Sequence, residues 1–120
     1  MSKKILIVED EKNIMLVYSR LLDKEGYEVL TAEDGLKGLE LAQEELPDLI
    51  LLDLVLPKLD GFKILSTLKE DDETKEIPVI IISARSDKES IETTLKAGAE
   101  NYLVKPVQKK ELLGQIKKYI

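Results

Sequence analysis

Polar side chains that could do chemistry stand directly after four short, mostly apolar runs of the sequence. They are the pair Glu9 and Asp10, then Asp53, Ser83 and Lys105. If each run is a strand of one parallel sheet, all four strand ends lie at the edge where such sheets bind ligands. An aspartate at this edge can act as a nucleophile toward a phosphoryl group, with a lysine and a metal ion to neutralise charge. We therefore expect these residues to form a phosphoryl-acceptor site.

The three carboxylates of this set also predict a metal site. Two unit charges about 4 Å apart repel with roughly 4 kcal/mol at an effective dielectric constant of about 20. A hard divalent cation would offset this repulsion between Glu9, Asp10 and Asp53. Oxygen ligands in such small number suit Mg²⁺, which keeps several of its waters. We expect Mg²⁺, for which Mn²⁺ could substitute.

Each of these residues alone also has a purely structural interpretation. The only role of Asp53 could be to cap a turn, and the only role of Asp10 could be to cap a helix. Ser83 could be a turn hydroxyl and Lys105 a surface lysine. Their joint occurrence at consecutive strand ends favours the functional interpretation.

Apolar and alternating patterns predict five strands. They are expected at residues 4–9, 27–31, 49–52, 79–82 and 101–104. The continuous apolar runs within the first, third and fourth are typical of strands buried on both faces of a parallel sheet. The second run alternates between polar and apolar residues, so we expect this strand at an edge of the sheet.

Helical periodicity predicts a helix after each strand. The residues expected to face inward are, helix by helix, Ile14, Val17, Tyr18, Leu21 and Leu22; Leu36, Leu39 and Ala42; Phe62, Leu65 and Leu68; Ile91 and Leu95; and Leu112, Leu113, Ile116 and Ile120. Asp34 and Asp60 are candidate N-caps, and Ser86 with Glu89 has the spacing of a capping box. Gly26 is placed to end the first helix.

Alternating strand–helix units imply an α/β fold, a doubly wound parallel sheet with helices on both faces. The 120 residues are expected to form one domain, residues 1–120. The absence of Cys and His excludes thiolate and imidazole metal sites and catalysis by either residue. A net charge of −6 argues against direct nucleic-acid binding. Because no signal peptide and no apolar run of roughly 20 residues is present, we expect a cytoplasmic protein without membrane segments.

Several sequence motifs surround the candidate site. They are ILIVED ending at Asp10, DLILLD ending at Asp53, LP followed by DGF, PVIIISA containing Ser83, and AGAENYLVKP containing Lys105. Together they resemble a response regulator receiver domain of two-component signalling, similar to the chemotaxis regulators, over essentially the whole chain. The resemblance implies a prokaryotic phosphoprotein with the (βα)5 flavodoxin-like fold and strand order 2-1-3-4-5.

The resemblance also implies roles for the residues at the strand ends. Asp53 would accept a phosphoryl group from a sensor histidine kinase or a phosphotransfer protein. Asp10, Asp53 and the backbone carbonyl of Val55 would ligate Mg²⁺, with Glu9 acting through water. Ser83 and Lys105 would hold the phosphoryl oxygens. Such a protein is a phosphoacceptor and not an enzyme with a separate substrate.

Further roles implied by the resemblance concern switching and the lifetime of the phosphoryl group. Tyr102 would swing inward on activation together with Ser83, and the change would reach an output partner through the fourth helix, fifth strand and fifth helix. A cis peptide between Lys105 and Pro106 would aim the lysine. Val55 and Arg85 would flank the phosphoryl group, and their chemistry predicts slow self-dephosphorylation.

The sequence departs modestly from the family, and other functions are disfavoured. Glu9 stands where the family usually has Asp, Ser83 replaces the commoner Thr, and Val107 replaces a common aromatic residue. A pseudo-receiver that is never phosphorylated would usually lack one of the site residues. An aspartate-nucleophile phosphatase would carry a second carboxylate where Val55 stands. A flavodoxin would need a phosphate loop after the first strand, where the acidic EDEKN stands.

The sequence is compatible with more than one class of output. Receivers of winged-helix transcription factors normally carry paired arginines on the fourth and fifth helices. Ile91 and Gln115 stand there, although Glu111 remains, which favours a single-domain regulator or another output class. A monomer and a phosphorylation-dependent dimer are both compatible with the sequence.

Overall fold

The computed structural model describes residues 2–120, in which strands and helices alternate from end to end. The strands are β1 (Lys4–Val8), β2 (Glu28–Ala32), β3 (Leu49–Leu52), β4 (Val79–Ser83) and β5 (Asn101–Val104). The helices are α1 (Lys12–Lys24), α2 (Gly35–Glu45), α3 (Gly61–Glu70), α4 (Lys88–Lys96) and α5 (Lys109–Tyr119). The expected strand–helix alternation is confirmed.

All neighbouring strands are parallel, in the order β2-β1-β3-β4-β5. The flavodoxin-like fold expected from the sequence is therefore confirmed. The register pairs Val8 of β1 with Leu52 of β3, and Ser83 of β4 with Val104 of β5. Because every strand points the same way, the residues after these pairs meet at one edge of the sheet.

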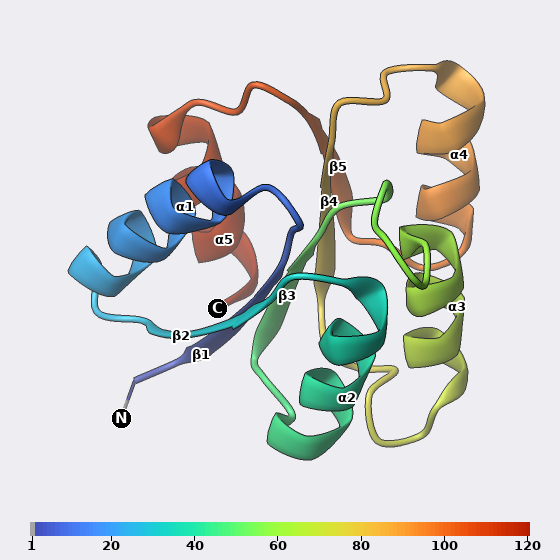
Figure 1. The fold of residues 1–120 in the computed structure, drawn as a ribbon, viewed down its shortest axis with the longest axis horizontal. Coiled ribbons are helices and arrows are strands. Elements are labelled where there is room, and N and C mark those ends of the chain that lie inside the picture. The colour runs from blue at the N-terminus through green and yellow to red at the C-terminus, as the bar shows by residue number, and fades with distance from the viewer. Residues whose placement is uncertain (1) are drawn as a thin grey trace.

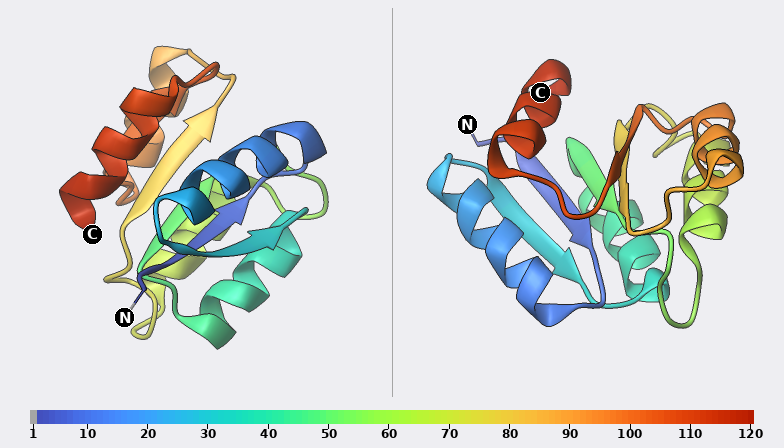
Figure 2. Two further views of the ribbon diagram at one scale, coloured as in Figure 1. Left: turned by 90° about the vertical axis from the view of Figure 1, so that its left-hand side faces the viewer. Right: turned by 90° about the horizontal axis from the view of Figure 1, so that it is seen from above.

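The sheet is covered on both faces, by α1 and α5 on one side and by α2, α3 and α4 on the other (Figures 1 and 2). Alternate residues of the central strands enter two separate cores. Ile5, Ile7, Leu49 and Leu51 pack beneath α1 and α5, whereas Leu6, Val8, Ile50 and Leu52 pack beneath the other helices. This double burial explains why β1, β3 and β4 are continuous apolar runs.

Several local predictions are confirmed. β2 lies at an edge of the sheet, although it starts one residue later than expected. Asp34 caps α2 by accepting the Lys37 N–H at 2.9 Å, and Asp60 caps α3 by accepting the Lys63 N–H at 3.0 Å. Gly26 follows the end of α1 in the left-handed region at φ 94°, which glycine tolerates.

The predicted capping box of α4 is wrong. The helix begins at Lys88, and its N-cap is Asp87, whose carboxylate accepts the Ser90 N–H at 2.9 Å. Ser86 therefore lies one residue before the cap. Asp and Ser are about equally good N-cap residues, so residue type does not distinguish Asp87 from Ser86. The three-residue spacing between Ser86 and Glu89 therefore led to the wrong N-cap.

Three inward assignments are also wrong. Val17, Leu36 and Leu95 are 62%, 54% and 41% exposed. The buried positions of their helices are Met15, Tyr18 and Leu22 in α1; Gly35, Gly38 and Ala42 in α2; and Ser90 and Thr94 in α4. Of the last two sets the apolar pattern identified only Ala42, because glycine and hydroxyl residues occupy the other buried positions.

Candidate functional site at the carboxyl edge of the sheet

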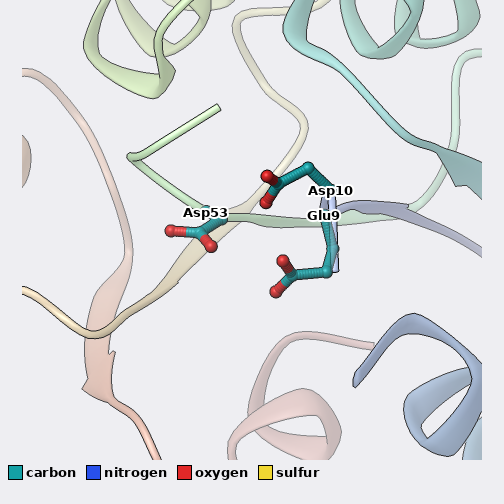
Figure 3. A group of neighbouring side chains, drawn as sticks. All are labelled: Glu9, Asp10 and Asp53. Carbon is teal, nitrogen blue, oxygen red and sulfur yellow. The ribbon is translucent and has the colours of Figure 1, made fainter. Parts of the chain in front are cut away.

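The predicted acidic residues meet where β1 and β3 end. The Asp53 N–H donates to the carbonyl of Val8 at 3.1 Å, so the chain leaves both strands at the same level. One oxygen from each of Glu9, Asp10 and Asp53 lies within 4.8 Å of the others. The three carboxylates lie beside one another at this edge (Figure 3). Glu9 and Asp53 are only 3% and 6% exposed, whereas Asp10 is open to solvent.

Lys105 joins the cluster from the end of β5. Its Nζ donates to Oε1 of Glu9 at 2.6 Å and to Oδ2 of Asp53 at 2.8 Å. The backbone N–H of Lys105 donates to the carbonyl of Ser83 at 2.9 Å, which ties β5 to the end of β4. The peptide bond between Lys105 and Pro106 is cis. A single ammonium group therefore bridges two carboxylates that come from different strands.

The second carboxylate oxygens of Glu9 and Asp53 accept backbone hydrogen bonds. Oε2 of Glu9 accepts the Glu11 N–H at 3.0 Å, and Oδ1 of Asp53 accepts the Val55 N–H at 3.2 Å. Glu11 is the N-cap residue of α1 but makes no side-chain cap. Asp10 is thus not the cap of this helix, and its carboxylate belongs to the acidic cluster instead.

The electrostatics of the cluster fit a divalent cation. Three carboxylates and one ammonium group, −3 and +1, leave two uncompensated negative charges. Burial raises the pKa of Glu9, more strongly than the hydrogen bonds from Lys105 and Glu11 lower it. Burial alone would lower the pKa of Lys105, but its hydrogen bonds to Asp53 and Glu9, together with their negative charges, raise this pKa. The donor set of carboxylate oxygens is the type that Mg²⁺ prefers.

Ser83 and Tyr102 lie beside this cluster on β4 and β5. Ser83 is fully buried, and its Oγ accepts the Arg85 N–H at 3.2 Å. Tyr102 is 9% exposed, and its hydroxyl donates to the Arg85 carbonyl at 2.6 Å. The structure therefore holds the tyrosine ring in an inward position and links it to the loop after β4.

The Arg85 side chain is exposed but contacts two partners that the sequence analysis missed. Its guanidinium carbon lies 5.6 Å from the centre of the Phe62 ring, within the range of a cation–π contact. Its Nε lies 3.5 Å from Oδ1 of Asp87. No spacing rule links residues 62 and 85, because only the fold brings the start of α3 next to the loop after β4.

A second missed feature is an apolar pocket beside Lys105. Its volume is about 460 Å³. It is lined by Asn13, Ile14, Val17, Tyr18, Lys105, Pro106 and Val107. The exposed Val17 that was expected in the core borders this pocket. Apolar residues in the sequence next to a site residue, as in Lys105-Pro106-Val107, were the available signal.

Comparisons with known proteins agree with this site and fold. The family model of the response regulator receiver domain matches residues 5–117. The polar-differentiation response regulator DivK of Brucella anthropi is 38% identical over 120 residues, which are 100% of this chain and 98% of the relative. The chemotaxis protein CheY4 of Vibrio cholerae has a TM-score of 0.93 at 29% identity, with 100% of both chains covered.

One further solved structure of similar fold contains a magnesium ion. The receiver domain of a sensor histidine kinase from Pseudomonas aeruginosa, with a magnesium ion coordinated in its active-site cleft, has a TM-score of 0.91 and 29% identity. The match covers 99% of this chain and 98% of that one. Within residues 2–120, no helix is long and apolar enough to cross a membrane. The fold, the acidic cluster and the sequence match together show that the chain belongs to the family of response regulator receiver domains.

Proposed function

We propose that this protein is a phosphorylation-controlled switch of a two-component system, in which Asp53 accepts a phosphoryl group in a Mg²⁺-dependent reaction. The observation that carries the proposal is the contact of Asp53 with Lys105, at 2.8 Å, inside a cluster with two excess negative charges. Phosphoryl transfer to a carboxylate requires a nucleophilic oxygen and positive charges that neutralise the phosphoryl group. Asp53 supplies the oxygen, and Lys105 and a metal ion bound by the acidic cluster would supply the positive charges.

The donor is a phosphohistidine of a sensor kinase or of a phosphotransfer protein. One carboxylate oxygen of Asp53 forms the new bond to phosphorus as the bond from phosphorus to the imidazole nitrogen breaks. The nitrogen keeps the electron pair of that bond, so no oxidant or reductant is needed. Lys105 and the Ser83 hydroxyl donate hydrogen bonds to the phosphoryl oxygens and hold them in place.

Asp10, Asp53 and the backbone carbonyl of Val55 would hold Mg²⁺. The metal, when bound, neutralises charge on the phosphoryl oxygens. Glu9 would act through a water molecule. Its two oxygens accept hydrogen bonds from Lys105 and from the Glu11 N–H, which fix the carboxylate beside the cluster.

The signal would leave through the face formed by α4, β5 and α5. Leu95 of α4 and Val104 of β5 are large apolar residues exposed on these elements, which supports contact with an output protein or domain. The chain would act in the cytoplasm without binding nucleic acid directly, as a monomer or a phosphorylation-dependent dimer. Loss of the phosphoryl group by self-hydrolysis would be slow.

The proposal is tested by incubating the protein with acetyl phosphate and Mg²⁺ and measuring the gain of one phosphoryl group by mass spectrometry. We expect Asp53→Ala to abolish the gain, because the acceptor oxygen is removed, while circular dichroism shows an intact fold. Asp23→Ala, which removes an exposed carboxylate of α1, is the control and should be phosphorylated normally. Phosphorylation that persists in Asp53→Ala would exclude Asp53 as the acceptor.

A further inference from the structure

The loop that follows Asp53 has no regular secondary structure, although its position matters for the site. This segment, residues 54–60, is called the acceptor loop here and joins β3 to α3. Its internal hydrogen bonds are few, and they include the Leu59 N–H to the Pro57 carbonyl at 2.8 Å. Lys58 adopts the left-handed region at φ 68°. Loops are generally more mobile than the elements they connect, so contacts with a neighbouring helix can restrict the conformation of this one.

The N-terminus of α2 supplies that support at two points. The Gly35 N–H donates to the Pro57 carbonyl at 3.3 Å. Nζ of Lys58 lies 3.4 Å from Oδ2 of Asp34, the N-cap of the same helix. Oδ1 of Asp34 accepts the Lys37 N–H, so the residue that holds the loop is itself fixed to the helix.

Gly35 is required by space and not by its backbone conformation, which lies outside the left-handed region. A Cβ atom at this position would overlap the carbonyl oxygen of Leu59 and would lie 2.7 Å from Cδ1 of Ile64. The first obstacle is backbone of the acceptor loop, which cannot rotate away as a flexible side chain can. Any side chain at position 35 would therefore push the loop off the helix.

The same face of α2 also abuts the other strand of the acidic cluster. Gly38 lies three residues after Gly35, and positions three apart share one helix face. A Cβ at Gly38 would lie 2.7 Å from Cγ1 of Val8, the residue before Glu9. The helix thus contacts both chain segments whose ends carry the carboxylates.

We infer that Gly35 is a positioning residue for the metal site. By letting the acceptor loop lie directly on α2, it sets the place of the Val55 carbonyl relative to the carboxylates of Asp10 and Asp53. This inference rests on the proposed function, because it takes that carbonyl as a metal ligand. Residues that orient a ligand typically change metal affinity by about 10- to 100-fold when they are replaced.

The test compares Mg²⁺ binding by Gly35→Ala and by Gly114→Ala. Gly114 lies in α5, where a Cβ would meet nothing within 4 Å, so this control makes the same chemical change without a clash. Mg²⁺ is titrated into the unphosphorylated protein, and the ¹⁵N shift of the Leu56 amide, which is bonded to the Val55 carbonyl, is followed. We expect the Kd for Mg²⁺ to rise by about tenfold or more in Gly35→Ala and to stay unchanged in Gly114→Ala.

If Gly35 has a merely structural role, Gly35→Ala will lower the melting temperature without changing the Kd or the Leu56 shift of the folded protein, and this result would overturn the inference.

If Gly35→Ala does not fold, the variant Asp34→Asn tests the inference instead. It keeps an N-cap oxygen but loses the ion pair with Lys58, and we expect a rise in Kd of about two- to fivefold. Its control is the neighbouring Glu33→Gln, an exposed carboxylate with no ion pair within the described residues. Equal Kd values for these two variants would overturn the inference.

Failure of the role inferred for Gly35 can be distinguished from failure of the proposed function. Absence of Mg²⁺ binding in the wild type would overturn the metal site and the role of Gly35 together. Normal Mg²⁺ binding with no phosphorylation of Asp53 would overturn the phosphoacceptor role and leave the role of Gly35 intact.

Discussion

Lys105 reduces the electrostatic repulsion between the buried carboxylates, because its ammonium group donates to both Glu9 and Asp53. Despite burial, these hydrogen bonds and the negative charges of the two carboxylates raise the pKa of Lys105, and burial raises the pKa of Glu9. A raised pKa in the folded state means that the group stabilises the fold below its unfolded pKa. That contribution is lost as the pH rises through the folded pKa. The Glu9 contribution is therefore lost as the pH rises above 4.5, the usual value for this group, and that of Lys105 only as the pH rises above 10.5.

Arg85 and Val55 should control how long the phosphoryl group lasts. An acyl phosphate is hydrolysed by in-line attack of water, and neither residue can act as a base. The exposed Val55 cannot hold a water molecule, and Arg85, packed against Phe62, can cover the approach. We expect the double variant Val55→Asn, Arg85→Glu to lose its phosphoryl group about tenfold faster, because the approach is opened and hydrated.

The measurement for this prediction is a decay time course of the phosphorylated protein in Mg²⁺ buffer. Arg20→Glu is the control, since it makes the same charge change at an exposed position of α1. Equal decay of the wild type and the double variant would exclude this role for Val55 and Arg85.

Among the elements, α4 carries a pH-dependent cap. Hydrogen bonds from Ser90 lower the pKa of Asp87. Because this pKa is lower in the folded state, the ionised cap stabilises the fold above the unfolded pKa, and the contribution is lost as the pH falls through the folded pKa. We expect Asp87→Ala to melt below the wild type at pH 7, with a smaller difference at pH values below 3.8, the usual value for this group.

Thermal melts at both pH values check this prediction, and Asp23→Ala serves as the control for loss of an exposed carboxylate. A difference between Asp87→Ala and the wild type that does not change with pH would show that the ionised cap contributes nothing.

Tyr102 of β5 connects the strand to the loop after β4. The ring is already buried, and its hydroxyl is tied to the Arg85 carbonyl, so the ring and the loop after β4 form one unit. If phosphorylation shifts this unit, its effect should reach α4 through the loop. We expect Tyr102→Ala to accept phosphoryl from acetyl phosphate normally but to lose the change in amide exchange of residues 84–96 that phosphorylation causes in the wild type.

Tyr102→Phe is the matched variant, since it keeps the ring and removes only the hydrogen bond to Arg85. It should keep part of the exchange change. An undiminished change in Tyr102→Ala would exclude the tyrosine from the signalling route.

The helices also show which parts of the fold the sequence could predict. β1, β3 and β4 were predictable because strands buried on both faces must be apolar throughout. The inward face of α2 was not, because Gly35 and Gly38 face the strand and loop there, and hydrophobicity does not mark glycine. In α4 the inward Thr94 satisfies its hydroxyl within the helix, by donating to the carbonyls of Ser90 and Ile91.

For the whole molecule, topology explains why the site was predictable and its details were not. Parallel strands with right-handed crossovers bring every strand end to one edge, so the meeting of Asp10, Asp53 and Lys105 follows from the order of elements. The bridging of Glu9 and Asp53 by one ammonium group, and the contact of Arg85 with Phe62, depend on side-chain packing between distant segments. Sequence spacing contains no information about such contacts.

Mg²⁺ bound at the acidic cluster should stabilise the whole domain. The molecule carries a net charge of −6 and concentrates three carboxylates within 4.8 Å, so a cation that binds the folded cluster and not the dispersed acids of the unfolded chain must stabilise the fold. At Mg²⁺ concentrations of about 10 to 100 times the Kd, the gain is about 1.4 to 2.7 kcal/mol. For a domain of this size, this corresponds to a rise of about 5 to 10 °C in Tm.

The prediction is checked by a series of thermal melts with increasing Mg²⁺ at constant ionic strength, with Asp10→Asn as the matched variant. Asp10→Asn should melt higher than the wild type without metal, because one repelling charge is gone, and should gain little from Mg²⁺. A Tm that rises equally in both proteins would place the cation elsewhere on the acidic surface.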